Sequence, residues 1–208
     1  MPTCPTRLRP FALCAAVALA LTAPLCRAAE DEHAHHHHQM DKSPGYARQV
    51  ASYRIPQISL VRADGRTVEF NRELDDGRPV VLNFIFTTCT AVCPVLSQSM
   101  AEFRRKLGPS ALPPHLVSVS IDPEQDTPAR LNAYAQRFGA DPAWNFYTGS
   151  SAASVTLQKA FQAHFGDKMH HRPMTFMRIA PGQPWLRLEG FATPDDLLKE
   201  YRLLTATP

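Results

Sequence analysis

The stretch Val80-Val-Leu-Asn-Phe-Ile-Phe-Thr-Thr-Cys89-Thr-Ala-Val-Cys93-Pro94 decides the fold of this 208-residue chain. Its first seven residues are almost all apolar and have the length of a strand, which is typical of a strand buried on both faces of a sheet. Apolar residues then recur at helical spacing; they are Val95, Leu96, Met100, Phe103 and Leu107. The stretch therefore predicts a buried strand that turns into a helix, with two cysteines at the junction.

Strands and helices alternate on both sides of this junction. The downstream apolar runs predict strands at 116–121, 146–147, 174–179 and 185–189, and helices at 127–138, 154–164 and from Thr193 onwards. Upstream, 58–62 and 67–70 flank Asp64-Gly65, a pair that favours the tight turn of a hairpin. The pattern predicts an α/β fold: a central sheet with helices on both faces and an N-terminal hairpin extension.

The chain divides into three expected parts. Residues 1–29 have basic, apolar and small residues in the order of a secretory signal peptide. Residues 30–45 contain a histidine-rich run among acids and are expected to form a disordered tail, whose imidazoles suit Cu(II). Residues 46–208 have the length of one folded domain. Export predicts a periplasmic location, and an uncleaved leader that anchors the chain in the membrane is the alternative.

Removal of the leader would leave Cys89 and Cys93 as the two cysteines of the mature chain. Two cysteines three residues apart are not a dense disulfide framework. A structural disulfide is the alternative, but so short a loop would restrain little of the unfolded chain. A strand-to-helix junction directs free backbone N–H groups and the positive end of the helix dipole toward them, which favours the thiolate form. Thiolate is both a redox nucleophile and a metal ligand, so we expect one of these functions.

The spacing of the cysteines allows their sulfurs to lie about one helical turn apart, where they can bridge each other or share an ion. Soft thiolates with one imidazole suit copper, whereas zinc usually requires a fourth ligand. The formal net charge of +3 includes the basic leader, and no basic cluster stands out. The sequence therefore favours copper and gives no support to nucleic-acid binding.

Three motifs together resemble the Sco/SenC family of copper chaperones for cytochrome c oxidase assembly. They are the cysteine motif, the segment Ser120-Ile-Asp122-Pro-Glu-Gln-Asp126-Thr-Pro128, and a histidine shortly before a strand. The resemblance runs from about Ser52 to the C-terminus. It implies a thioredoxin-like fold, with copper held by Cys89, Cys93 and a histidine.

Two residues, His170 and His171, are candidates for the third ligand, and the spacing to the following strand favours His171. The family commonly has aspartate before this histidine and a small hydroxyl residue after it. Here His170 and Arg172 occupy those positions. Asp122 and Asp126 could form a carboxylate pair at the site, but loop formation before a helix is the simpler interpretation.

The resemblance implies a metallochaperone that delivers copper to cytochrome c oxidase or prepares its dinuclear copper site. Its expected partners are the copper-bearing oxidase subunit or another copper chaperone, with the chain acting as a monomer close to the membrane. The alternative is an enzyme, a periplasmic thiol–disulfide reductase in which Cys89 attacks a disulfide of that subunit and Cys93 resolves the mixed disulfide. The histidine distinguishes the metallochaperone from the reductase, because tight copper binding needs a third ligand and thiol–disulfide exchange does not.

Overall fold

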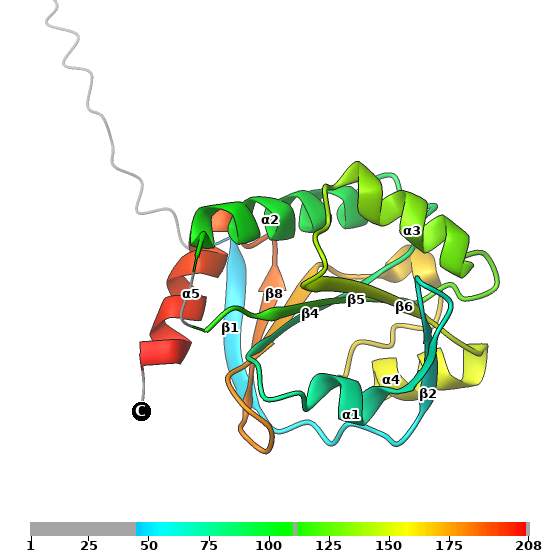
Figure 1. Ribbon diagram of the computed structural model, residues 1–208, viewed down its shortest axis with the longest axis horizontal. Helices are drawn as coiled ribbons and strands as arrows, with labels where there is room; N and C mark the ends of the chain where they lie inside the picture. The colour runs from blue at the N-terminus through cyan, green and yellow to red at the C-terminus, as the bar shows by residue number, and fades with distance from the viewer. Residues whose placement is uncertain (1–44, 110–111, 207–208) are drawn as a thin grey trace, which may run out of the picture. The chain divides into compact units, whose positions relative to one another are not determined.

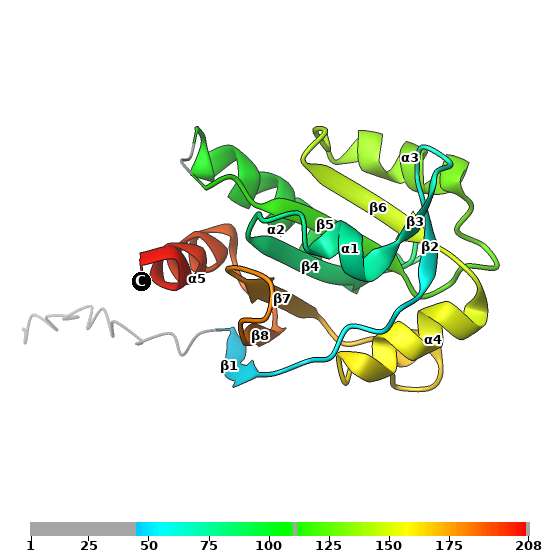
Figure 2. The same ribbon diagram turned by 60° about the horizontal axis from the view of Figure 1, so that its bottom comes forward.

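The computed structural model describes residues 45–109 and 112–206. In this part of the chain, eight strands form one mixed sheet in the order β1-β8-β7-β4-β5-β6-β2-β3 (Figures 1 and 2). The strands are β1 Tyr46–Ala51, β2 Ser59–Arg62, β3 Thr67–Glu69, β4 Val80–Ile85, β5 His115–Ser120, β6 Trp144–Thr148, β7 Met174–Arg178 and β8 Trp185–Gly190. The helices are α1 Phe70–Leu74, α2 Val92–Leu107, α3 Pro128–Arg137, α4 Ser151–Ala160, the 3₁₀ turn η1 Lys168–His170, and α5 Pro194–Ala206.

Strand β4 lies at the centre of the sheet, parallel to β5 and antiparallel to β7. Successive side chains of a strand point to opposite faces. Val81 and Ile85 accordingly join one core with residues of α2, α3 and α5, whereas Leu82 and Phe84 join a second core with residues of α1 and α4. Figure 1 shows α2 and α3 above the sheet and α1 and α4 below it. The predicted α/β sheet with helices on both faces is confirmed.

The edges of the sheet differ from the expectation. The predicted hairpin forms as β2 and β3, with Gly65 at φ +87° in its turn, but β2 also pairs with β6, so the hairpin extends the main sheet. Strand β1 was not predicted, because most of its side chains are exposed and leave no apolar alternation. Glu200 of α5 holds β1 by accepting hydrogen bonds from Tyr46 Oη at 3.0 Å and Arg48 Nε at 2.9 Å.

Side-chain caps set the starts of two helices. The Thr127 hydroxyl accepts a hydrogen bond from the amide of Arg130 at 3.3 Å, which confirms the predicted start of α3. Helix α4 begins at Ser151, earlier than predicted, because the Ser150 hydroxyl accepts from the amide of Ala153 at 3.1 Å. The short helix α1 was not predicted.

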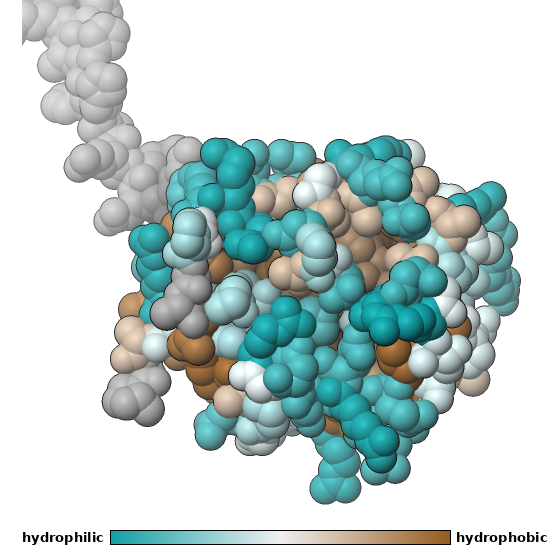
Figure 3. Space-filling view, in the orientation of Figure 1, coloured by the Kyte–Doolittle hydropathy of each residue, from teal (hydrophilic) through white to brown (hydrophobic). Residues whose placement is uncertain are grey.

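None of the described helices is long and apolar enough to cross a membrane. The expected leader and histidine-rich tail lie outside the described residues. The face of the molecule in Figure 3 is largely hydrophilic with small apolar areas, which is ordinary for a protein surface.

Candidate metal centre

Cys89 lies in the turn between β4 and α2. Its amide donates to the carbonyl of Phe86 at 3.1 Å, and α2 begins three residues later at Val92. Ala91, at the N-cap of α2, provides no side-chain acceptor. The amide of Cys93 instead donates to Sγ of Cys89 at 3.3 Å. The sulfur thus takes the place of the capping oxygen at the start of the helix.

The two cysteines are both free thiols in unlike surroundings. Burial raises the pKa of the half-buried Cys89, but backbone N–H groups of Cys93, Ala91 and Val92 oppose it and leave the pKa below its ordinary value. Cys93 is fully buried, and this burial raises the pKa of its thiol well above the usual range. Cys89 is therefore the sulfur that ionises first and meets solvent.

We expect iodoacetamide to modify Cys89 faster than Cys93, with alkylation of Cys89 beginning at the lower pH because thiolate is the reacting form. Mass spectrometry of each cysteine between about pH 5 and pH 9 would give both profiles. In a Cys89→Ser protein, alkylation of Cys93 should be slow across the whole of this pH range. Superimposable profiles for the two cysteines would contradict the assignment.

His171 follows η1 and precedes β7. Its Nε2 lies 3.0 Å from the carbonyl oxygen of Phe84, and a carbonyl can only accept, so Nε2 bears the hydrogen. Burial lowers the pKa of His171 although the hydrogen bond to Phe84 opposes this, so the ring is neutral near pH 7. A neutral ring with hydrogen on Nε2 leaves the lone pair of Nδ1 available for a metal.

One cavity joins Cys89 and His171. It has a volume of about 110 Å³, and Phe86, Lys168 and Met169 also line it. His170 is exposed and is not among the lining residues. Within residues 45–109 and 112–206, no three His, Cys, Asp or Glu side chains are grouped as a metal site. Binding of one ion by Cys89, Cys93 and His171 together therefore requires side-chain rearrangement.

Asp126 supports the cysteine loop from a distance. Its carboxylate is fully buried and accepts from the amide of Thr87 at 3.1 Å, the hydroxyl of Thr87 at 2.5 Å and the hydroxyl of Ser120 at 2.6 Å. Thr87 is two residues before Cys89. The sequence interpretation of Asp126 as a loop former overlooked this contact, because nothing local in the sequence joins positions 39 residues apart.

Asp122 supports the segment that contains His171. Its Oδ2 pairs with Nζ of Lys168 at 2.6 Å, and Lys168 also lies 5.8 Å from the centre of the Phe86 ring. The amide of His171 donates to the carbonyl of Lys168 at 3.0 Å. These contacts connect the loop after β5, the segment after β4 and the histidine. Neither Asp122 nor Asp126 lines the cavity.

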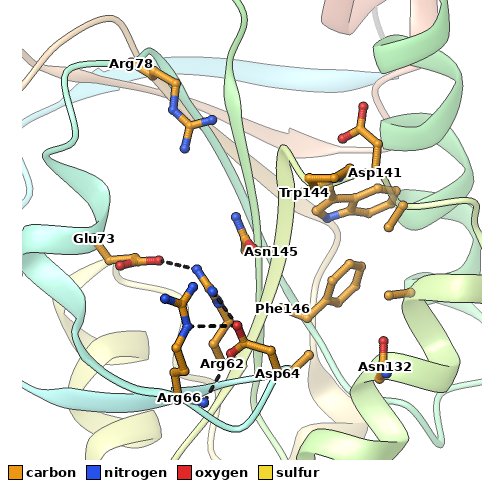
Figure 4. Close-up of a pocket in the computed structure, with 14 residues that line it drawn as sticks. Arg62, Asp64, Arg66, Glu73, Arg78, Asn132, Asp141, Trp144, Asn145 and Phe146 are labelled. Carbon is orange, nitrogen blue, oxygen red and sulfur yellow. Dashed lines mark hydrogen bonds and ion pairs between the residues drawn. The ribbon is translucent and has the colours of Figure 1, made fainter.

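A larger hollow of about 540 Å³ lies at the opposite end of β4, where Arg78 precedes the strand (Figure 4). Three arginines line it, and each is paired with a carboxylate: Arg62 with Asp64 and Glu73, Arg66 with Asp64, and Arg78 with Asp76. Because these charges are neutralised within the fold, the hollow is not built as an anion site. The cysteine cavity is the better candidate site.

Comparison with known proteins agrees with the fold and the motifs. The SCO1/SenC family model matches residues 48–204. The chain is 29% identical over 115 residues to the SCO1 protein homolog of Bacillus subtilis (strain 168); the match covers 54% of this chain and 58% of that relative, so it spans less than two thirds of the relative's length.

Solved structures share the thioredoxin-like fold. Arabidopsis thaliana ScoI with copper bound gives a TM-score of 0.64 at 23% identity, covering 73% of this chain and 97% of that one. Bradyrhizobium japonicum ScoI with copper bound gives a TM-score of 0.59 at 22% identity, and the match covers 73% of this chain and 99% of that one. Since the family model covers well over half of the sequence, the chain belongs to the SCO1/SenC family.

Proposed function

We propose that this protein is a metallochaperone that holds copper through Cys89, Cys93 and His171. It delivers the ion to cytochrome c oxidase or prepares the dinuclear copper site of that enzyme. One observation above all supports the proposal: Cys89 and His171, 82 positions apart in the sequence, line the same cavity, and the amide of Cys93 donates a hydrogen bond to Sγ of Cys89. Family membership and the copper-bound relatives add to it.

The three side chains would contribute different properties to copper binding. Cys89 supplies a half-exposed sulfur that ionises readily, and His171 supplies a neutral imidazole. Cys93 holds its proton tightly, so engaging its sulfur would release a proton and make affinity rise with pH. Two soft sulfurs and one nitrogen form a donor set that suits Cu(I).

Replacement of either cysteine by serine should remove tight Cu(I) binding, because one thiolate and one imidazole are too few soft donors. Competition with a coloured Cu(I) chelator, using reduced protein, measures the affinity. Val95→Ala is the matched control, since Val95 is exposed two residues after Cys93, does not line the cavity and should leave the affinity unchanged. Tight binding by both serine variants would refute the proposed ligand set.

The unlike surroundings of the two cysteines favour a second candidate function, thiol–disulfide reduction. The thiolate of Cys89 would attack a disulfide of the oxidase copper subunit and form a mixed disulfide, with release of one thiol. The Cys93 thiolate would then displace the second, so that Cys89 and Cys93 become oxidised as the partner is reduced. The buried, high-pKa Cys93 suits the resolving position, because only intramolecular attack reaches it.

The same proposal places the protein in the periplasm, as a monomer that meets the copper-bearing oxidase subunit or another copper chaperone near the membrane. It rests on the leader-like residues 1–29 and on the family. It divides the chain into a leader, a histidine-rich tail at 30–45 and a copper-binding domain at 46–208.

A further inference from the structure

Met169 has a side chain that packing does not explain. It is 72% exposed in the middle of η1, whereas Met100, Met174 and Met177 are fully buried. A large apolar side chain gains little from such a position, since its surface stays in water. Its backbone is nevertheless held in place, because the amide of Met169 donates to Oδ1 of Asp167 at 2.8 Å.

The position of Met169 relates it to the proposed copper site. It lines the cavity that also contains Cys89 and His171. Of the three proposed ligands, Cys93 is fully buried and His171 is only 9% exposed, with its Nε2 bonded to Phe84. Cys89 and Met169 are thus the two sulfurs that an incoming ion meets first at the opening of this cavity.

We propose that Met169 is a capture ligand whose thioether binds Cu(I) together with Cys89, before Cys93 and His171 complete the site. This inference rests on the proposed function. A thioether is a soft donor that needs no deprotonation, and it binds more weakly than a thiolate, so it can be displaced readily. The copper keeps its oxidation state throughout, and the methionine sulfur leaves as the buried ligands engage.

The charge at the opening agrees with ligand exchange. Lys168, which lines the same cavity, places a cation there, paired with Asp122. That pairing neutralises the cation, and no carboxylate is among the described residues that line the cavity, so charge does not draw a free metal ion in and the first contact comes from donor atoms. The same two sulfurs would be available when copper leaves toward an acceptor protein.

A Met169→Leu variant tests the inference, because leucine keeps the apolar character and approximate size but lacks the sulfur. We expect its equilibrium affinity for Cu(I) to match the wild type, while transfer of Cu(I) from a chelator complex slows about tenfold in stopped-flow measurements. His170→Ala is the matched control: it changes the next, exposed residue, which does not line the cavity, and should not slow transfer. A wild-type rate for Met169→Leu would overturn the inference.

Nuclear magnetic resonance of methionine labelled with ¹³C in its methyl group gives a second measurement. In the His171→Ala protein, where the final site cannot close, Cu(I) should shift the Met169 methyl signal and leave those of Met100, Met174 and Met177 in place. An unshifted Met169 signal would contradict capture. If wild-type protein binds Cu(I) tightly but neither Met169 result appears, only this inference fails; if the wild type does not bind Cu(I), the proposed function fails with it.

Discussion

Replacing His171 with alanine is expected to abolish tight Cu(I) binding while the two cysteines retain their thiol chemistry. Loss of a hydrogen-bond partner behind a metal ligand already weakens affinity about 10- to 100-fold, so loss of the ligand itself should cost more than about a hundredfold. Cys89 should keep its reactivity, because the N–H groups that lower its pKa come from Ala91, Val92 and Cys93 and not from the histidine. Chelator competition and alkylation rates measure the two properties separately.

His170→Ala is the control for this experiment. The two histidines are adjacent in sequence, but His170 is exposed and does not line the cavity, so its removal should leave Cu(I) affinity intact. The reverse result, with His170 essential and His171 dispensable, would refute the assignment. Undiminished copper affinity in both variants, together with rapid reduction of a partner disulfide, would favour the reductase.

Replacing Asp126 with alanine is expected to lower the free energy of unfolding by about 3 kcal/mol, since three hydrogen-bond donors lose their acceptor inside the fold. They are the amide and hydroxyl of Thr87 and the hydroxyl of Ser120. For a chain of this length, such a loss corresponds to a fall of about 6–12 °C in melting temperature. Urea titration and calorimetry would measure both quantities.

The matched control is Glu124→Ala, two residues away in the same loop. Glu124 is exposed and accepts one long hydrogen bond, from Ser151 at 3.4 Å, so its removal should change stability by less than about 0.5 kcal/mol. Equal stability of the Asp126→Ala and Glu124→Ala proteins would show that the carboxylate network does not support the fold. Alkylation of Cys89 in the Asp126→Ala protein would then show whether the cysteine loop also depends on it.

Local patterns in the sequence were sufficient for the centre of the fold. The apolar run before Cys89 predicted β4, and the helical spacing after it predicted α2, because both elements bury the residues that define their period. Strand β1 shows what local sequence patterns cannot predict. Its partner is β8, far along the chain, and its exposed side chains give no period, so only tertiary structure reveals it.

The position of the two cysteines at the candidate site was predictable from the sequence, and the surroundings of the site were less so. Cys89 and Cys93 are marked by their spacing at a strand-to-helix junction. Between His170 and His171, spacing gave only a preference, whereas the structure shows that His171 lines the cavity with Cys89 and that His170 is exposed outside it. The support from Asp126 depends on a contact across two loops, and sequence periodicity contains no such information.

The hydrogen bond from the Cys93 amide to Sγ of Cys89 couples the chemical state of Cys89 to the stability of the start of α2. When Cys89 is unengaged, its Sγ accepts the amide of Cys93 and steadies the first turn of a 16-residue helix. A metal ion or a mixed disulfide at this sulfur would compete with that amide, so we expect the first turn of α2 to fray more often in that state. We therefore expect engagement of Sγ to loosen the first turn of α2, and its release to restore the hydrogen bond from the Cys93 amide.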